Sequence, residues 1–423
     1  MDIIRDPLWN NIRVDSLGME LVDTHVFQRL RYVRQLGLAY LVYPGATHTR
    51  FEHALGAYHL ARTTLQLLDE QGALRGVPIE ERAIVRSAAL LHDVGHYPFS
   101  HAIEEIGALH HEELARPRIL EGRVAEILRD ALGSDAPERV FALIRGTSDS
   151  ALQGLISGSL DLDKIEYLKR DALMCGVPYG EIDVDRLVHS LVLVPDPAHG
   201  RPVVGVVEKG LSALESLLFA KYQMYRNVYW HHAVRSGTAM YKRLVDDALR
   251  SGTLEADQLG TYTDEGLLHQ LERRAPSSLL ASLRERRLYK RGFECPAAEL
   301  PLDAAEWIAD DRALAVEVED RLAAEVGLEP GELLLDFPAK TEMLGLDLPV
   351  LRRNGEVRRL TSSGLEGAIN LPVLSEQLYR SARWLRVFVA RPVDLPRSRL
   401  LALLLGDPAS VRERLAAPRL LTP

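Results

Sequence analysis

Four segments in the N-terminal half of the chain carry apolar residues at helical spacing. The pattern predicts helices over 24–36, 50–70, 80–93 and 161–173. In the second segment an apolar stripe begins at Phe51, and the flanks of that stripe are apolar as well. A helix that is apolar on most of its sides is buried, so we expect residues 50–70 to lie inside the protein core.

Strand signals are fewer and lie further along the chain. Residues 201–207 and 384–390 each predict a short strand. The segment 348–360 contains Asn354-Gly355, a strong signal for a tight hairpin. Aromatic residues make up only 6% of the chain, while Leu, Ala, Arg and Glu dominate it. We therefore predict a mainly α protein that has a helical core and a smaller mixed α/β region.

The character of the chain changes near residue 250. The segment 251–253, Ser-Gly-Thr, interrupts a helical pattern, and the residues after it are rich in Glu, Arg and Leu. A chain of 423 residues has room for two to four domains at about 100–200 residues each. We predict a helical core at 1–250 and a mixed α/β region at 251–423 that serves oligomerisation or completes a pocket.

Composition narrows the class of protein. Lys and Arg number 51 against 60 Asp and Glu, a net charge of −9, which argues against a generally basic nucleic-acid binder but not against a local positive pocket. Cys175 and Cys295 are the only cysteines, so a disulfide scaffold and a cysteine-based zinc module are excluded. The longest apolar runs are shorter than the ~18 residues of a membrane span. We expect a cytoplasmic protein without a membrane partner.

Histidines are concentrated in one part of the chain. Eight of the 14 lie between His48 and His111, where an even distribution would place about two. Neutral imidazole is a common metal ligand, and imidazolium is a common partner of phosphate. A metal and phosphate site explains the whole group, whereas a purely structural explanation needs many separate buried imidazoles.

Two places in this window have the character of ligand positions. His92-Asp93 closes a run of small and apolar residues, so the end of a packed helix presents an imidazole beside a carboxylate. An adjacent His-Asp pair also occurs at helix ends without a ligand. His53 lies in the predicted buried helix and needs a hydrogen bond or a metal. His59, six residues further on, points away from His53 and is expected to be structural.

A third group of polar residues follows in the segment 161–173. Asp163, Tyr167 and Asp171 are four residues apart and share one helix face, with Lys164 beside them. These groups would suit a metal, a phosphate and a sugar hydroxyl. The alternative is that Asp163 and Glu166 form a capping box and the other residues a solvated face. The segment alone does not decide between the two.

Taken together, His53, His92-Asp93 and Asp163 form the ordered pattern H…HD…D, which resembles the ligand signature of the HD-domain phosphohydrolase superfamily. Longer motifs resemble the deoxynucleoside triphosphate (dNTP) triphosphohydrolases, a group that includes bacterial enzymes and a human HD-domain restriction factor. The resemblance covers about residues 1–245. The motifs lie at 23–37, 44–53, 92–101 and 161–171.

The resemblance implies a mononuclear or dinuclear metal site that cleaves a dNTP into a deoxynucleoside and triphosphate. The implied metal ligands are His53, His92, Asp93 and Asp163. They would hold a divalent cation (Mn, Fe, Mg, Zn or Ni), because His and Asp accept all of these.

The resemblance assigns the remaining site residues to the reaction and to the substrate. His96 and His101 would contact phosphates or assist acid–base steps, Glu104 would orient an imidazole, and His111 would be the general acid. The implied substrate contacts are Arg50, Lys164 and Tyr167 for the phosphates, Gln35 and Asp171 for the 3′-hydroxyl, and Tyr229 as the wall that disfavours a 2′-hydroxyl.

In some relatives a guanine nucleotide binds at a subunit interface and activates a tetramer. Five residues match that effector site: Asp23, Gln28 and Arg31 at the guanine, and Arg186 and Lys209 at the phosphates. This chain also departs from the pattern, with Asp2 in place of a lysine, Val207 in place of an arginine, and His231-His232 in place of two lysines. The alternative for Asp23, Gln28 and Arg31 is an ordinary capped helix. The resemblance implies a homodimer or a homotetramer.

Two other functions remain open from the sequence. The chain could be an HD phosphohydrolase for another phosphoester, such as a nucleoside monophosphate, a cyclic nucleotide or single-stranded nucleic acid. It could also be a non-catalytic nucleotide sensor. The motif Asp163-Lys164 with Tyr167 and Arg50 favours a triphosphate substrate, and the complete ligand set favours an enzyme.

Overall fold

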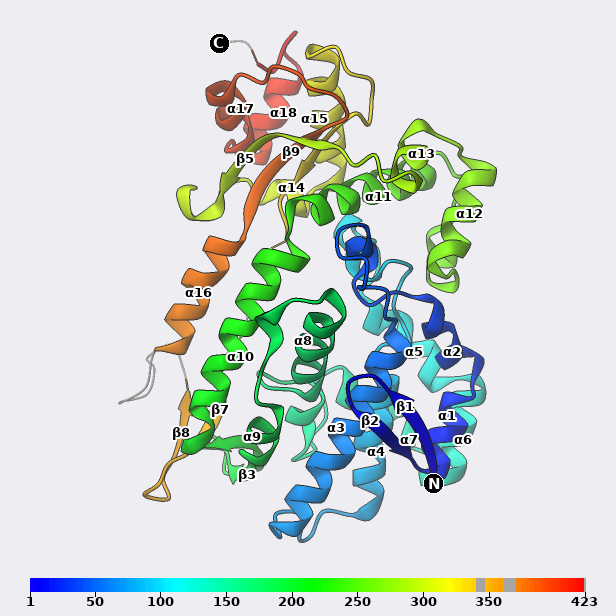
Figure 1. Ribbon diagram of the computed structural model, residues 1–423, viewed down its shortest axis with the longest axis vertical. Coiled ribbons are helices and arrows are strands. Elements are labelled where there is room, and N and C mark those ends of the chain that lie inside the picture. Colours follow the sequence, from blue (N-terminus) through cyan, green and yellow to red (C-terminus); the bar gives the residue numbers. More distant parts are fainter. Residues whose placement is uncertain (340–346, 361–369, 422–423) are drawn as a thin grey trace.

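Helices form most of the protein (Figure 1). The computed structural model describes residues 1–339, 347–360 and 370–421. Its helices are α1 (Ser16–Val22), α2 (His25–Gln28), α3 (Arg50–Glu70), α4 (Ile79–Leu91), α5 (His111–Leu120), α6 (Gly122–Leu132), α7 (Ala136–Ile144), α8 (Leu162–Cys175), α9 (Val184–His189), α10 (Leu211–Met224), α11 (His232–Arg250), α12 (Asp264–Arg274), α13 (Ser278–Arg284), α14 (Trp307–Asp310), α15 (Arg312–Glu325), α16 (Leu371–Ala382), α17 (Arg397–Leu404) and α18 (Pro408–Leu415). Within the described residues, none of them has the length and apolarity needed to span a membrane.

Within the described ranges, the strands form three small sheets. A hairpin pairs β1 (Asp2–Asp6) with β2 (Asn10–Val14). A four-stranded sheet has the order β3 (Leu191–Pro195), β4 (Pro202–Val207), β7 (Leu348–Leu351) and β8 (Val357–Leu360), with β4 and β7 parallel. A three-stranded antiparallel sheet has the order β5 (Lys290–Pro296), β9 (Trp384–Val389) and β6 (Leu333–Asp336). The mainly α fold with a mixed α/β C-terminal region is confirmed.

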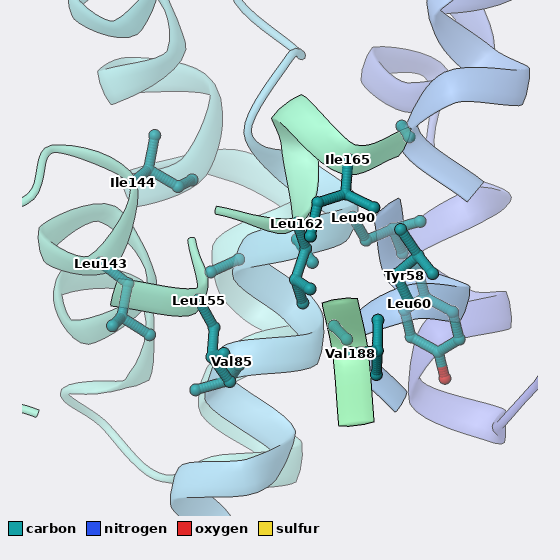
Figure 2. Packing of buried hydrophobic residues seen from close by; sticks show 14 of the residues in the cluster. Tyr58, Leu60, Val85, Leu90, Leu143, Ile144, Leu155, Leu162, Ile165 and Val188 are labelled. Carbon is teal, nitrogen blue, oxygen red and sulfur yellow. The ribbon is translucent and has the colours of Figure 1, made fainter. Parts of the chain in front are cut away.

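Helix α3 forms the centre of the core, as its all-round apolar sequence predicted. Its residues pack against α4 and α8, and Figure 2 shows Tyr58 and Leu60 of α3 among side chains of α4, α7, α8 and α9. The labelled neighbours include Leu90 and Ile165, and both are fully buried. Burying a side chain of this size stabilises the fold by about 1.5–3 kcal/mol. The core therefore fixes the N-terminal end of α3, where Arg50 and His53 lie.

The strand predictions are confirmed in all three places. Strands β4 and β9 occupy the segments 201–207 and 384–390 almost exactly as expected, and β7 and β8 form a hairpin whose turn contains Asn354-Gly355. Gly355 has a φ of 85°, a left-handed conformation that glycine adopts without strain. The four-stranded sheet joins strands from both sides of residue 250. The division into 1–250 and 251–423 stays a prediction.

The single helix expected over 24–36 is wrong. The chain forms only α2 and a 3-10 turn at Arg29–Tyr32, and it is then extended at Val33. Hydrogen bonds from distant residues outweigh local helix propensity here. Gln35 donates its backbone N–H to His48 over 3.0 Å, and Arg34 donates its own to Asp264 over 3.0 Å. Hydrogen bonds to residues that are distant in the sequence therefore determine this conformation, and local hydrophobic spacing does not predict them.

A buried ionic cluster connects α11 with the C-terminal sheet, which lies above the helical core in Figure 1. Arg235 of α11 donates to both carboxylate oxygens of Glu105 over 2.8–2.9 Å, and its Nε lies 3.1 Å from Asp336 in β6. Lys242 donates to Glu105 over 3.0 Å. The Asp336 side chain is fully buried, so its charge depends on Arg235.

The substitution Arg235→Met leaves Asp336 buried without its cation. We expect the free energy of unfolding to fall by about 3–5 kcal/mol, measured by urea denaturation. Arg123→Met is the control, because Arg123 and Glu126 form an ion pair with 64% and 60% of the side chains exposed, and its loss costs less than about 1 kcal/mol. Equal losses in the two variants would contradict the role of the cluster.

Candidate metal centre and active site

The ends of three helices bring the predicted metal ligands together. His53 lies in the first turn of α3, which begins at a capping box of Thr49 and Glu52. His92 caps the C-terminal end of α4, and Asp93 follows it. Asp163 lies in the first turn of α8. The apolar packing of these helices thus places four donor side chains from three distant segments at one point.

The donor atoms lie at distances that suit a single cation. His53 Nε2 is 3.1 Å from His92 Nε2, 2.9 Å from Asp163 Oδ1 and 3.6 Å from Asp93 Oδ2. His92 Nε2 is 3.3 Å from Asp93 Oδ1 and 3.5 Å from Asp163 Oδ1. Ligands that share a divalent ion at about 2.0–2.2 Å lie at comparable separations. His53, His92 and Asp93 therefore form a group whose donor atoms all lie within 4.8 Å of one another and could hold a metal ion, and Asp163 Oδ1 lies beside both imidazoles.

Electrostatics at this point favour a cation. Burial alone would raise the pKa of Asp93, but Arg50 and His92 outweigh burial and hold this pKa well below its usual range. Burial likewise opposes the charged form of Asp163, and hydrogen bonds from His53 and His92 lower its pKa well below its usual range. Both carboxylates are ionised at neutral pH, and a metal ion competes with protons for the imidazoles.

One side of the metal centre is open. The His53 and Asp93 side chains are 1% and 3% exposed, whereas His92 and Asp163 keep 14% and 34% exposed. His53 and Asp93 are thus the buried members of the group, and His92 and Asp163 are its partly exposed members.

Glu166 is a buried partner of His53 that sequence analysis did not assign. Its Oε2 lies 2.6 Å from His53 Nδ1, and its Oε1 accepts hydrogen bonds from Arg170 Nε over 2.8 Å and from Trp9 Nε1 over 3.0 Å. Arg170 in turn donates to Asp6 over 2.9 Å. A carboxylate on Nδ1 orients a metal-binding imidazole and leaves Nε2 for the ion.

This arrangement corrects the capping-box alternative for Asp163 and Glu166. The N-cap of α8 is Asp161, which accepts from Lys164 N over 2.9 Å, while Glu166 is fully buried. A Cβ at Gly56 of α3 would lie 1.9 Å from Glu166 Oε1, so glycine makes room for this carboxylate. The sequence signal that was missed is Glu166 and Arg170, one turn apart among the apolar positions of α8.

A second group of polar side chains lies beside the metal centre. Its members are His96, His101, Glu104 and His111, whose donor atoms lie within 4.8 Å of one another. Glu104 Oε1 lies 3.1 Å from His111 Nδ1 and 3.3 Å from His101 Nδ1, and the rings of His96 and His111 stack at 3.8 Å. Burial lowers the pKa of His111, and burial with the charge of Arg50 lowers that of His96 well below its usual range.

Arg50 connects the two groups. Its Nη1 donates to Asp93 Oδ2 over 2.6 Å, and its Nη2 lies 3.5 Å from His101 Nε2. Ser100 accepts from Arg50 Nε over 3.0 Å, at a turn where Phe99 and Ser100 have φ of 57° and 62°. Asp264 accepts from Phe99 N over 2.8 Å and supports this strained turn.

Two of the predicted sugar contacts, Tyr229 and Asp171, bond to each other. Tyr229 OH donates to Asp171 Oδ2 over 2.7 Å, and His48 Nε2 lies 2.8 Å from Asp171 Oδ1. Tyr229 reaches Asp171 from a π-helical turn, Tyr225–Tyr229, a local irregularity that is frequent at functional sites. The side-chain oxygen of Gln35 is buried and has no hydrogen-bond partner among the described residues.

A second lysine, Lys221, lies close enough to the predicted phosphate contact Lys164 to feel its charge. Lys164 pairs with Asp161 and donates to Gly158 O over 3.0 Å, and the Tyr167 ring lies 6.5 Å from that of His53. Lys221 of α10 is 3% exposed, and burial together with the charge of Lys164 lowers its pKa to about 7. A lysine within the apolar face of 211–224 is the signal that could have indicated Lys221.

The residues matched to an effector site lie in two separate places (Figure 1). Gln28 joins Arg31 through a 2.8 Å hydrogen bond, and both lie near α1 and α2, as does Asp23 at the end of α1. Arg186 of α9 donates to the backbone oxygen of Lys209 over 3.3 Å, on the other side of the core. The structure therefore does not bring the five residues into one site within a single chain.

Comparisons with known proteins agree with this geometry. Residues 50–170 match the HD domain, and residues 182–366 match the HD associated region. An uncharacterized protein of Methanocaldococcus jannaschii is 33% identical over 77% of this chain and 67% of its own length. A deoxynucleoside triphosphate triphosphohydrolase SAMHD1 homolog of Dictyostelium discoideum is 28% identical over 74% of this chain and 63% of its own length.

The crystal structure of a hypothetical protein from Aquifex aeolicus has a TM-score of 0.71 at 29% identity and covers 92% of this chain and 96% of the other. The fold and the site together define a metal-dependent phosphohydrolase of the HD-domain type. The chain belongs to the HD-domain family that contains the deoxynucleoside triphosphate triphosphohydrolases. It spans about two thirds of the length of the two sequence relatives described.

The substitution Glu166→Gln removes the charge that holds His53 Nδ1 and compensates Arg170. We expect the dissociation constant of the bound divalent metal to rise by about 10- to 100-fold, measured by competition with a chromophoric chelator. Glu126→Gln on the exposed face of α6 is the control and should leave the constant unchanged. An unchanged metal affinity in Glu166→Gln would contradict the orienting role.

Proposed function

We propose that this protein is a divalent-metal-dependent hydrolase that converts dNTPs into deoxynucleoside and inorganic triphosphate. The observation that carries the proposal is the order of groups along α8. Asp163 lies with the metal ligands, Tyr167 one turn further, and Asp171 with the sugar contacts two turns further. Eight residues of helix span about 12 Å, which suits a phosphorylated deoxyribose lying along this face.

The metal centre and the arginine beside it act on the phosphates. His53, His92, Asp93 and Asp163 would hold the cation, which when bound lowers the pKa of a water molecule and screens polyphosphate charge. Arg50 adds positive charge at Asp93, and Lys164 and Lys221 add it on the side of α8 and α10.

The histidine group beside Arg50 supplies the proton chemistry. Cleavage of the bond between the α-phosphorus and the 5′-oxygen leaves the deoxynucleoside oxygen in need of a proton, while the triphosphate takes up the hydroxyl group. His111, held on Nδ1 by Glu104, is the proton donor in this proposal. Its lowered pKa rises toward neutrality when an anionic phosphate approaches, because a nearby negative charge favours the imidazolium.

We further propose that the protein is a homodimer or homotetramer with a nucleotide effector. Helices α1 and α2, at which Asp23 and Gln28 lie, are set apart from α9, which carries Arg186 (Figure 1). One small nucleotide can contact both groups only where two copies of the chain meet. This supports an effector at an interface between subunits.

Incubation of the purified protein with Mn²⁺ and each dNTP tests the reaction. We expect intact triphosphate and deoxynucleoside, resolved by chromatography, and a loss of turnover of at least about 100-fold in His92→Ala, because one ligand of the metal is gone.

Release of only orthophosphate or pyrophosphate would reject the reaction type. Unchanged turnover in His92→Ala would reject the metal assignment, and binding without turnover would favour a nucleotide sensor. Activity only in mixtures of dNTPs would reveal an effector.

The pH profile of kcat/KM tests the role of Lys221. Burial, the charge of Lys164 and the opposing charges of Asp161 and Asp163 set its pKa at about 7. An amine with this pKa is charged below pH 7 and neutral above it, so kcat/KM should fall as pH rises through about 7. Lys221→Arg keeps its charge and should lose this fall, while Lys221→Met should raise KM by about 10-fold. Identical profiles in wild type and Lys221→Arg would contradict the assignment.

A further inference from the structure

His48 contacts two of the predicted sugar contacts, Asp171 and Gln35, and has no role in the chemistry described above. It lies in the loop before α3 and is 2% exposed. Its ring nitrogen Nε2 lies 2.8 Å from Asp171 Oδ1, and its backbone oxygen accepts from Gln35 N over 3.0 Å. One residue therefore fixes the carboxylate of Asp171 through its side chain and the backbone of Gln35 through its main chain.

The surroundings of Asp171 restrict the orientation of its carboxylate. Asp171 is 1% exposed, and its two oxygens accept from different sides, Oδ1 from the His48 ring and Oδ2 from the Tyr229 hydroxyl. Each carboxylate oxygen has a further lone pair. With both donors in place the carboxylate cannot rotate, and the remaining lone pairs have a fixed direction.

The chemistry of this subsite calls for a hydroxyl donor. Gln35 Oε1 is a buried acceptor without a hydrogen-bond partner in the described parts of the chain, and Asp171 is a buried anion. Buried acceptors are costly unless a donor satisfies them. A sugar hydroxyl supplies such a donor, whereas a 3′-phosphate or a 3′-phosphodiester would meet the negative charge of Asp171.

We propose that His48 is a positioning residue that fixes the Asp171 carboxylate and thereby makes the site selective for nucleotides with a free 3′-hydroxyl. The inference rests on the proposed function, since it assigns the sugar to the Asp171 end of α8. It excludes internal positions of nucleic acid as substrates and admits only nucleotides whose 3′-hydroxyl is unesterified. His48 acts through Asp171 and does not touch the reacting atoms.

The test compares a dNTP with its 2′,3′-dideoxy counterpart as substrates of the full-length metal-loaded protein. Wild type should prefer the dNTP by about 10- to 100-fold in kcat/KM, the effect of one hydrogen bond to a charged group. His48→Leu removes the ring donor and should reduce the preference to about 3-fold or less, through loss on the dNTP alone. His48→Gln keeps a side-chain N–H at similar reach and should retain most of the preference.

The dideoxy substrate separates positioning from a general structural effect. A merely structural role of His48 would lower kcat/KM for both substrates equally in His48→Leu, and that result would overturn the proposal. Should His48→Leu fail to fold, His48→Phe takes its place, because it keeps a ring and lacks the donor that Asp171 Oδ1 accepts. Loss of the preference in His48→Phe supports the proposal, and an unchanged preference overturns it. His269→Leu, on the exposed face of α12, is the matched control.

Failure of the proposed function gives a different result. Where wild type hydrolyses neither nucleotide, calorimetric dissociation constants for the same pair replace kcat/KM. A 10-fold or larger preference for the 3′-hydroxyl that His48→Leu abolishes would then sustain the role of His48 while the reaction is rejected. Equal affinity of wild type for the two nucleotides would overturn the inference.

Discussion

Each charge that is buried at the junction of α3, α4 and α8 needs an opposite charge beside it. Side chains from several parts of the chain supply these opposite charges. Asp93 is held by Arg50, and Glu166 by His53 and Arg170. Removing one member of such a set leaves a buried charge without compensation, which costs several kcal/mol. The apolar helices of the core provide the scaffold, but the ion pairs fix the position of each donor atom.

Helix ends rather than helix interiors supply the predicted metal ligands. His53 and Asp163 lie in the first turns of α3 and α8, and His92 caps α4. The positive end of a helix dipole favours anions, so the first turns of α3 and α8 support both the carboxylates and an incoming phosphate. The ends of these helices lie at the edge of the packed core. For this reason His53 and Asp93 can be buried while His92 and Asp163 stay partly exposed.

Those features of the fold that depend on local pattern could be predicted from the sequence. The apolar flanks of α3 predicted a buried helix, and Asn354-Gly355 predicted the hairpin of β7 and β8, because each signal lies within one element. The ordered pattern of histidines and aspartates likewise indicated the four residues that the structure brings together. The adjacent pair His92-Asp93 is visible within one short segment, whereas the grouping of this pair with His53 and Asp163 came from the family resemblance.

The features that the sequence did not predict depend on distant partners. Residues 24–36 do not form one helix because His48 and Asp264 take up hydrogen bonds of this segment. Glu166 is buried against residues of α3 and of the N-terminal hairpin, so its role could not be separated from that of a helix cap. The π-helical turn that ends at Tyr229 has no local signature in the sequence. A charged residue reveals its function only when its partner is known.

Trp9 and Asp6 belong to the N-terminal hairpin, yet they complete the hydrogen bonds of Glu166 and Arg170 behind the metal centre. The residues that match the HD domain begin only at Arg50. A fragment cut at the limits of that domain would therefore keep every predicted metal ligand. It would lose Trp9 and Asp6, which bond to Glu166 and Arg170 behind those ligands. The part of the chain that matches the HD domain is therefore smaller than the part that supports its predicted metal centre.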